Sequence, residues 1–311
     1  MRDIPVIIVE NETIAEAYES ALVRLYNEGC NFKTQYDKPE DPESIDATMN
    51  ITVRCPLKDP MIHKAFPGGI EDLREYVMEL QGAKNHWCKN INDPEDTRWL
   101  YTYSKRLTEY GSWREKEDII DADEKVIGYR EVDKGYKINQ IAYCIDKLIE
   151  QPYTRQAQAI IWNPMLDLNA HDAPCLQSLY FRMAEDQGEY WLNANIRIRS
   201  NDAYCAFLMN IFGFTIFIKE NIADVIAKRT GKKVNLARLN WQADSWHIYG
   251  KDIAQAKARL FDRIGKTKFE DRVYNFYDPD IQEIYNEATP KIEEKIRVET
   301  EKMRKQSITH D

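Results

Sequence analysis

The stretch YWLNANIRIRSNDAYCAFLMNIFGFTIFI, residues 190–218, decides how the chain folds. Residues 190–199 predict a strand, and residues 203–218 are apolar on almost every side, which predicts a helix buried at the centre of the molecule. The polar cluster Arg199-Ser200-Asn201-Asp202 joins the two. Its simplest role is to cap the helix, but a guanidinium and backbone N–H groups at a strand-to-helix junction can also hold an anion.

The rest of the chain mixes strands and helices in no regular order. Further strands are predicted at residues 5–9, 51–53, 156–162, 179–183 and 234–243. Further helices are predicted at residues 14–28, 70–80, 138–148, 220–230 and from residue 252 onward. Residues 31–48 are polar and contain prolines, which predicts a loop, and the charge-rich residues 114–134 predict a surface excursion. Because strands and helices do not alternate regularly, we expect the α+β class rather than a doubly wound sheet.

Composition narrows the range of partners. The chain has 311 residues, 43% of them hydrophobic, and a formal net charge of -9 without a concentrated basic face. This argues against a nucleic-acid polymer as partner, whereas a mononucleotide needs only a few local cations. No apolar run is long enough for a membrane span. The six cysteines form no CxxC pair and the five histidines show no metal-ligand spacing, so we expect reduced thiols in the cytoplasm and no metal.

Cys175 lies in the segment Ala173-Pro174-Cys175-Leu176, 24 residues before Arg199. A lone cysteine is more often a small buried hydrophobic residue than a nucleophile. Cys175 differs because it follows a proline in a polar loop between predicted strands. Nearby arginines can lower the pKa of such a thiol, and an Arg-Ser pair can hold a phosphate beside it. We therefore expect a covalent enzyme that acts on a phosphorylated substrate, most simply a nucleotide.

Three further polar residues have both a structural and a functional interpretation. Asn210 falls inside the apolar helix, where it belongs either to a structural network or to a site that recognises the edge of a base. His247 and Tyr249 lie on one face of a strand end. They either stabilise that strand end or bind a sugar hydroxyl.

Taken in order, these segments resemble the thymidylate synthase superfamily, over roughly residues 50–250. The motifs are Pro174-Cys175, Arg199-Ser200-Asn201-Asp202, Asn210, Asp244 with His247-Ile248-Tyr249, Thr154-Arg155-Gln156, Tyr101-Thr102-Tyr103 and Leu80-Gln81-Gly82. The resemblance implies a mixed β-sheet packed by helices and a dimer formed through the face of the sheet. It also implies a catalytic domain over residues 1–252, which leaves residues 253–311 as a charged helical extension.

The resemblance also implies a role for each site residue. Cys175 would add to C6 of a pyrimidine nucleoside monophosphate, and 5,10-methylenetetrahydrofolate or another methylene-tetrahydropterin would provide one carbon. The other roles are phosphate binding by Arg199, Ser200 and the neighbouring chain's Arg155, ribose binding by His247 and Tyr249, base binding by Asn210, pterin binding by Asp202, Trp87 and Trp99, and proton transfer by Glu75 and Tyr103. Glu75 is found by counting back from Gln81-Gly82, and Glu79 is the runner-up. The site would be shared within a homodimer.

Three functions follow from these features. The first is a methyltransferase that converts dUMP to dTMP, which Asn210 favours because cytosine-specific hydroxymethylases tend to carry an acid there. The second is a 5-hydroxymethylase acting on dUMP, dCMP or CMP, which Gln156 and the charged residues 253–311 favour. The third is a catalytically silent homologue that binds nucleotide, against which the intact Cys175 argues.

Overall fold

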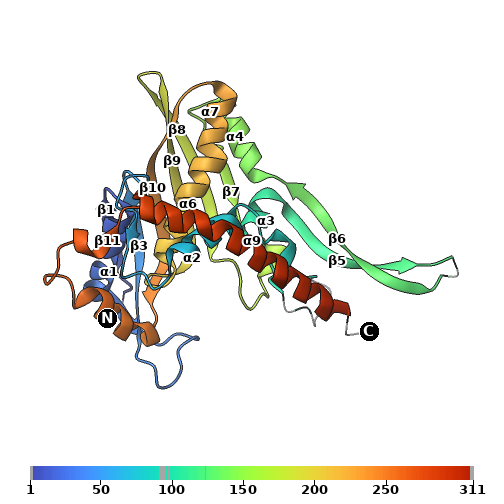
Figure 1. The fold of residues 1–311 in the computed structure, drawn as a ribbon, viewed down its shortest axis with the longest axis horizontal. Helices are drawn as coiled ribbons and strands as arrows, with labels where there is room; N and C mark the ends of the chain where they lie inside the picture. The colour runs from blue at the N-terminus through green and yellow to red at the C-terminus, as the bar shows by residue number, and fades with distance from the viewer. Residues whose placement is uncertain (1–2, 91–95, 97, 123, 309–311) are drawn as a thin grey trace.

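A mixed β-sheet forms the centre of the molecule in the computed structural model, which describes residues 3–90, 96, 98–122 and 124–308 (Figure 1). Within these residues its strands run in the order β1 (Val6–Asn11), β3 (Ser44–Val53), β10 (Val234–Ile248), β9 (Glu189–Asp202), β8 (Leu176–Asp186) and β7 (Gln158–Ile160), and β2 (Cys30–Phe32) also pairs with β3. The pairs β1–β3 and β9–β10 are parallel, whereas β3–β10, β8–β9 and β7–β8 are antiparallel. The predicted α+β class is confirmed.

Helices cover one face of this sheet (Figure 1). The helices of the described chain are α1 (Ile14–Glu28), α2 (Ile70–Leu80), α3 (Tyr103–Thr108), α4 (Gln140–Glu150), α5 (Pro164–Asp167), α6 (Phe207–Ile218), α7 (Asp224–Thr230), α8 (Ile253–Ala256) and α9 (Pro279–Ile308). Short 3-10 or π turns lie at Asn85–Trp87, Lys219–Ala223, Gly250–Asp252, Lys257–Phe261 and Glu270–Arg272. None of the described helices is long and apolar enough to cross a membrane.

The central helix α6 is buried almost all round, as its composition predicts, but it begins at Phe207. Residues 203–206 form a turn instead, because the carboxylate of Asp202 accepts the backbone N–H groups of Tyr204 and Cys205 (3.0 and 2.8 Å). α2 packs directly against α6 at Gly213, where a Cβ atom would lie 2.4 Å from the ring of Tyr76. The close packing of these two helices fixes one wall of the site described below.

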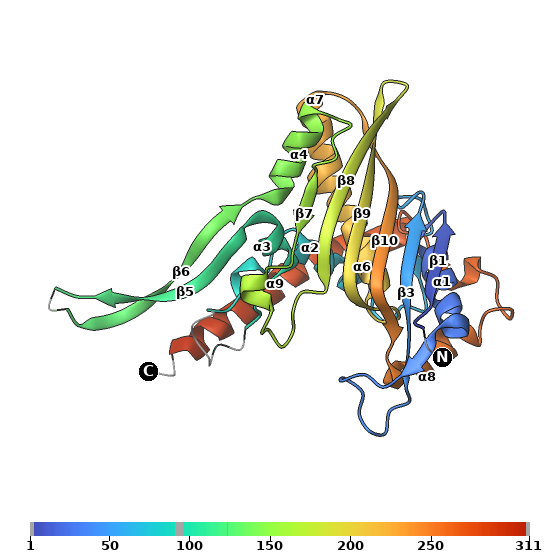
Figure 2. The ribbon, with the colours of Figure 1, turned by 180° about the vertical axis from the view of Figure 1, so that it is seen from behind.

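The opposite face of the sheet has no helix in front of β7, β8, β9 and β10 in the described part of the chain (Figure 2). Several apolar side chains on strands of the sheet are exposed, among them Val6 (70% exposed), Ile8 (65%) and Trp191 (39%). In each strand these residues alternate with buried neighbours that face the helices. This face is therefore available for the expected dimer, which stays a prediction.

The N-terminal loop prediction is partly wrong. Residues 31–48 were expected to form a loop, but β2 includes Asn31 and Phe32, and β3 begins at Ser44. Inward-facing apolar side chains alternate from Ile45 to Val53, so the strand starts well before its most hydrophobic part. The predicted surface excursion at residues 114–134 lies in a long hairpin of β5 (Tyr110–Ile120) and β6 (Val126–Ile138), which projects from the body (Figure 1).

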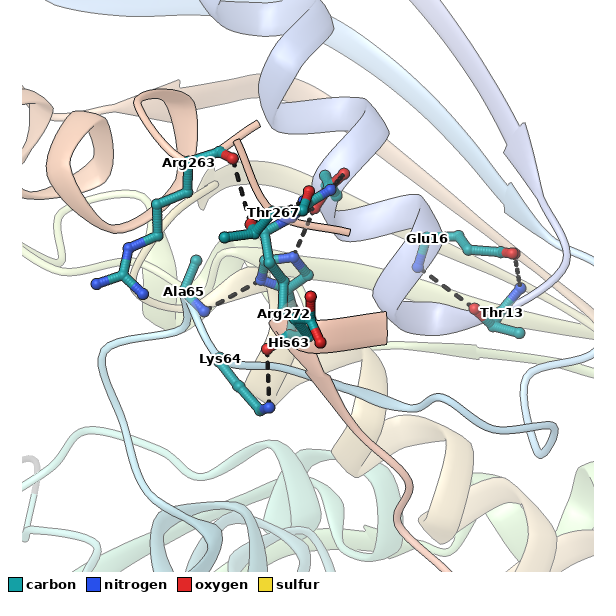
Figure 3. A network of polar contacts seen from close by, with 10 residues as sticks. Thr13, Glu16, His63, Lys64, Ala65, Arg263, Thr267 and Arg272 are labelled. Atoms are coloured by element: carbon teal, nitrogen blue, oxygen red, sulfur yellow. Dashed lines mark hydrogen bonds and ion pairs between the residues drawn. The ribbon is translucent and has the colours of Figure 1, made fainter. Parts of the chain in front are cut away.

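The segment after residue 252 packs onto the rest of the molecule. β11 (Val273–Tyr274) pairs with β4 (Ile62–His63), and Arg272 donates two hydrogen bonds to the carboxylate of Glu19 on α1 (2.8 and 2.7 Å). His63 bonds the same carboxylate at 2.8 Å, in the polar network of Figure 3. α9 packs against α2, and Phe276 and Tyr285 join the main core. A domain boundary at residue 252 stays a prediction.

Candidate active site

A cavity of about 1160 Å³ opens at the ends of β9 and β10, beside α2 and α6. The loop before β8 and residues 98–103 complete its wall. Eight of the residues singled out from the sequence line it, namely Trp99, Tyr103, Cys175, Ser200, Asp202, Asn210, His247 and Tyr249. Four others, Glu75, Trp87, Arg155 and Arg199, do not line it. The fold therefore gathers side chains that lie up to 150 residues apart in the sequence into one space.

Cys175 lies half-buried directly before β8, with the guanidinium of Arg199 next to it. Arg199 donates from Nε to the carbonyl of Pro174 (3.1 Å) and from Nη2 to that of Ala173 (2.5 Å), which fixes the loop that carries the thiol. Burial raises the pKa of the Cys175 thiol, whereas Arg199 lowers it and Asp172 raises it. The resting thiol is therefore protonated near neutral pH, and Arg199 is the neighbouring charge that favours its ionised form.

Tyr103 approaches the same loop from the start of α3. Its hydroxyl oxygen accepts the backbone N–H of Leu176 at 3.3 Å, so the ring lies beside the nucleophile. Burial raises the pKa of Tyr103, and the neighbouring Cys175 raises it further. Its hydroxyl therefore stays protonated and can exchange a proton within the cavity.

The carboxamide of Asn210 is oriented by a chain of hydrogen bonds that begins at Trp241. The indole N–H of Trp241 donates to Oδ1 of Asn201 (3.1 Å), and Nδ2 of Asn201 donates to Oδ1 of Asn210 (3.0 Å). An indole nitrogen can only donate, so the Asn201 atom that it contacts must be the amide oxygen. The other Asn201 atom is then the NH₂ group, which donates to Asn210. Oδ1 of Asn210 is thus occupied by Asn201, and its Nδ2 group is the remaining donor at the cavity wall, beside the hydroxyl of Tyr76.

His247 and Tyr249 project from the end of β10. In the sheet His247 lies between Asp46 of β3 and Asp202 of β9, which are its partners in the register. Burial lowers the pKa of His247, although Asp46 and Asp202 oppose that effect, so the ring is neutral near pH 7. The ring of Tyr249 stands at 71° to that of His247, with the ring centres 4.6 Å apart. Burial raises the pKa of Tyr249 to about 12, so it keeps its hydroxyl proton.

The two glutamates of α2 are placed differently from the sequence-based assignment. Glu75 does not line the cavity and instead pairs with Lys84 (2.8 Å) and Lys295 of α9 (2.9 Å). Glu79, one turn later, does line it and pairs with Lys84 at 3.2 Å. Burial raises the pKa of Glu79, and Lys84 only partly offsets the effect. Of the two glutamates, Glu79 therefore faces the cavity and Glu75 faces α9, and which of them transfers a proton stays a prediction.

The outer part of the cavity offers aromatic surfaces and a carboxylate. Trp99 is 42% exposed and lines the wall beside Tyr101, whereas Trp87 is buried behind Trp99 with the ring centres 5.6 Å apart. Trp87 donates from Nε1 to Thr300 of α9 (3.0 Å), so it supports the wall rather than forming it. Burial raises the pKa of Asp202, although its bonds from backbone N–H groups oppose this. Flat aromatic surfaces, a carboxylate and this volume fit a methylene-pterin next to a nucleotide.

Two further expectations concern groups at the edge of this site. Arg155 is exposed on the loop before β7, so its expected role in the neighbouring chain's site stays a prediction. Among the described residues, Asp202, Cys205 and Asp252 each place one ligand atom within 4.8 Å of the others. Burial raises the pKa of Cys205 to about 12, so its thiol is protonated at neutral pH and is a poor metal ligand in that form.

Several lining residues were not singled out from the sequence. Tyr76 was not named at all, and Tyr101 was quoted only as part of the Tyr101-Thr102-Tyr103 motif without a role, yet both line the cavity. Asn201 was quoted only as part of a polar cluster, although it orients Asn210. Asn201 could have been found from its position between an apolar strand and an apolar helix, because a polar side chain there must have buried hydrogen-bond partners.

Comparisons with known proteins agree with this geometry. A family model described as thymidylate synthase matches residues 75–298. A protein of Methanocaldococcus jannaschii that bears the name "Putative thymidylate synthase" is 28% identical over 247 residues, which cover 78% of this chain and 90% of the relative. The thymidylate synthase of Bacillus licheniformis is 25% identical over 179 residues, 54% of this chain and 58% of the relative. The solved structure of the thermostable thymidylate synthase A from Bacillus subtilis has a similar fold, with a TM-score of 0.55 and 17% identity, and the match covers 80% of this chain and 84% of that one.

Proposed function

Because the chain belongs to the thymidylate synthase family, we propose that it transfers a one-carbon unit to C5 of a pyrimidine nucleotide, converting dUMP to dTMP through an adduct at Cys175. The observation that carries this proposal is the meeting of Cys175, Asn210 and the His247–Tyr249 pair in one cavity. A nucleophile, a base-binding amide and a sugar-binding pair are what the reaction needs on one nucleotide.

Cys175 begins the reaction when its thiolate adds to C6 of the pyrimidine. The thiol must first lose its proton, which burial disfavours and the positive charge of Arg199 favours. Ser200 lines the cavity beside Arg199 in the sequence, and together with the partner's arginine they would bind the phosphate. Arg199 does not line the cavity, and its Nε and Nη2 bind the carbonyls of Pro174 and Ala173, so only the rest of its guanidinium would be available to the phosphate.

Asn210 stabilises the charge that this addition creates. When sulfur adds to C6, negative charge develops on O4 of a uracil ring, and the Nδ2 group of Asn210, whose Oδ1 is occupied by Asn201, would donate to that oxygen. The amino group at C4 of cytosine would itself donate, so two donors would face each other. The orientation of this amide therefore favours uracil over cytosine.

Proton transfers at the reacting carbons fall to Tyr103 and Glu79. Both groups line the cavity and both are protonated at a higher pH than usual because burial raises their pKa. Trp99, Tyr101 and Asp202 would hold the methylene-pterin against the nucleotide. When bound, that pterin supplies the one-carbon unit and, in the synthase reaction, the hydride that completes the methyl group.

We also propose that the active unit is a homodimer formed through the helix-free face of the sheet. The exposed Val6, Ile8 and Trp191 support this interface. Such a dimer would let Arg155 of one chain reach the phosphate bound by the other.

The test is incubation of the protein with dUMP, dCMP or CMP and 5,10-methylenetetrahydrofolate, with products identified by mass. We expect dTMP from dUMP and no product from the other two nucleotides. A hydroxymethyl product in place of dTMP would support the hydroxymethylase alternative, and binding without any product would support the silent homologue. Cys175→Ala is the matched control, since it should bind dUMP and give no product.

A further inference from the structure

We propose that Asp46 and Ser245 hold His247 in the Nδ1–H form, so that Nε2 presents a hydrogen-bond acceptor to a hydroxyl of the bound sugar. This inference rests on the proposed function for the identity of the ligand. The hydrogen bonds that carry it belong to the protein alone. Asp46 and Ser245 are positioning residues in this scheme and do not touch the nucleotide.

A bulge in β10 brings Ser245 to the required place. Ala243 is opposite Met49 of β3 and Trp246 is opposite Ala47, so residues 244 and 245 together face the single residue Thr48. The hydroxyl of Thr48 donates to the carbonyl of Asp244 at 2.8 Å, which stabilises the bulge. Bulges commonly re-aim a side chain next to a site. Here the result is that the Ser245 hydroxyl lies between the side chains of Asp46 and His247.

The direction of each hydrogen bond follows from counting protons. Oγ of Ser245 lies 2.6 Å from Oδ2 of Asp46 and 3.1 Å from Nδ1 of His247. A carboxylate only accepts, so the single hydroxyl proton of Ser245 is donated to Asp46. Oγ then has only lone pairs for His247, and Nδ1 must carry the proton.

The other ring nitrogen is therefore an acceptor. His247 is only 5% exposed and lines the cavity, and its Nε2 has no hydrogen-bond partner among the described residues. A buried acceptor without a partner is costly, so a ligand that binds here gains by donating to it. Phosphate oxygens and base carbonyls cannot donate, whereas a sugar hydroxyl can. Tyr249, beside His247, can donate to the oxygen of the same sugar hydroxyl. His247 would then accept the proton of that hydroxyl and Tyr249 would donate to its oxygen.

His63 provides an internal comparison with the opposite arrangement. Its Nδ1 accepts the backbone N–H of Ala65 at 3.1 Å (Figure 3). Its Nε2 lies 2.8 Å from the carboxylate of Glu19. A nitrogen that accepts from an amide carries no proton, so His63 is protonated on Nε2. The two buried histidines should therefore give different ring spectra in one sample.

The direct test is a long-range ¹H–¹⁵N spectrum of the full-length protein with labelled histidine rings at neutral pH. His247→Gln assigns the signals of His247, and His63 serves as the reference for a proton on Nε2. We expect the His247 proton on Nδ1, and a proton on Nε2 would overturn the proposal. This readout needs no turnover, so it stands apart from any failure of the proposed reaction.

Variants of the serine test its role. Ser245→Ala should release the ring from the Nδ1–H form and weaken dUMP binding about tenfold, the effect of losing one well-placed hydrogen bond. Ser245→Thr keeps the hydroxyl and should restore both the spectrum and the affinity. An unchanged ring spectrum in Ser245→Ala would overturn the role of Ser245. If Ser245→Ala does not fold, Asp46→Asn replaces it, because an amide no longer obliges Ser245 to donate.

Discussion

Replacing Glu79 with glutamine removes one ionisable group from the cavity and leaves its shape almost unchanged. Lys84 keeps its closer contact with Glu75 at 2.8 Å, so the lost 3.2 Å contact should cost about 1 kcal/mol of folding free energy. The catalytic loss should be larger, because removing a positioned proton-transfer group lowers the rate about 10²–10⁴-fold, or about 3–5 kcal/mol of barrier. Binding of dUMP should change little, since Glu79 is not expected to touch it.

The assay is kcat for dTMP formation at saturating substrates over a range of pH. Burial raises the pKa of Glu79, so the wild-type profile should contain a limb from a carboxyl group that titrates above its usual range. That limb should be absent in Glu79→Gln. The matched control is Glu75→Gln on the same helix, which loses ion pairs with Lys84 and Lys295 but should keep kcat within about threefold. If both variants fold and Glu75→Gln loses as much kcat as Glu79→Gln, the assignment of proton transfer to Glu79 from its position in the cavity is refuted.

Two further predictions concern the fold and the assembly. Burial opposes ionisation of Glu19, but hydrogen bonds from His63 and Arg272 outweigh it and lower its pKa from 4.5 to about 2. The ionised Glu19 therefore contributes about 3 kcal/mol to the free energy of unfolding above pH 4.5, and this contribution is lost as the pH falls toward 2. In urea unfolding, the difference in stability between wild type and Glu19→Gln should be largest at pH 7 and much smaller at pH 3. A difference that stays constant with pH would contradict this. Mixing Cys175→Ala with Arg155→Ala chains should restore about a quarter of wild-type activity if Arg155 acts across the dimer; no recovery in dimers shown to exchange would argue against a shared site.

Much of this molecule could be predicted from local patterns. The apolar run at residues 203–218 located the central helix, and the alternation after residue 190 located a central strand. The sequence pointed to Cys175, Asn210 and the His247–Tyr249 pair because each is a polar or reactive residue in an unusual place. Cys175 follows a proline in a loop, Asn210 lies inside an apolar helix, and the pair lies at the end of a strand. Such residues carry their signal in their own neighbourhood, and the structure brings all four into the cavity.

Other site residues could not be found in this way. Glu75 and Glu79 are both charged and lie one turn apart, and only the packing of α2 against α6 and α9 decides which one faces the cavity. Asp46 fell inside a predicted loop, because the prolines before it hid the start of β3. Its relation to His247, which lies 201 residues later in the chain, depends on β3 and β10 meeting in one register. Pairing over such distances leaves no local trace in the sequence.

The position of β10 has a consequence for how the protein reaches its working state. β10 lies between β3 and β9 and begins 181 residues after β3 ends, so β1 and β3 cannot join the sheet until most of the chain is available. Contacts this far apart in the chain are slow to form. The row Asp46–His247–Asp202 crosses that same junction. Closure of the sheet and formation of the row around His247 are therefore one event, so we expect a newly made chain to gain nucleotide affinity only after β10 has paired with β3.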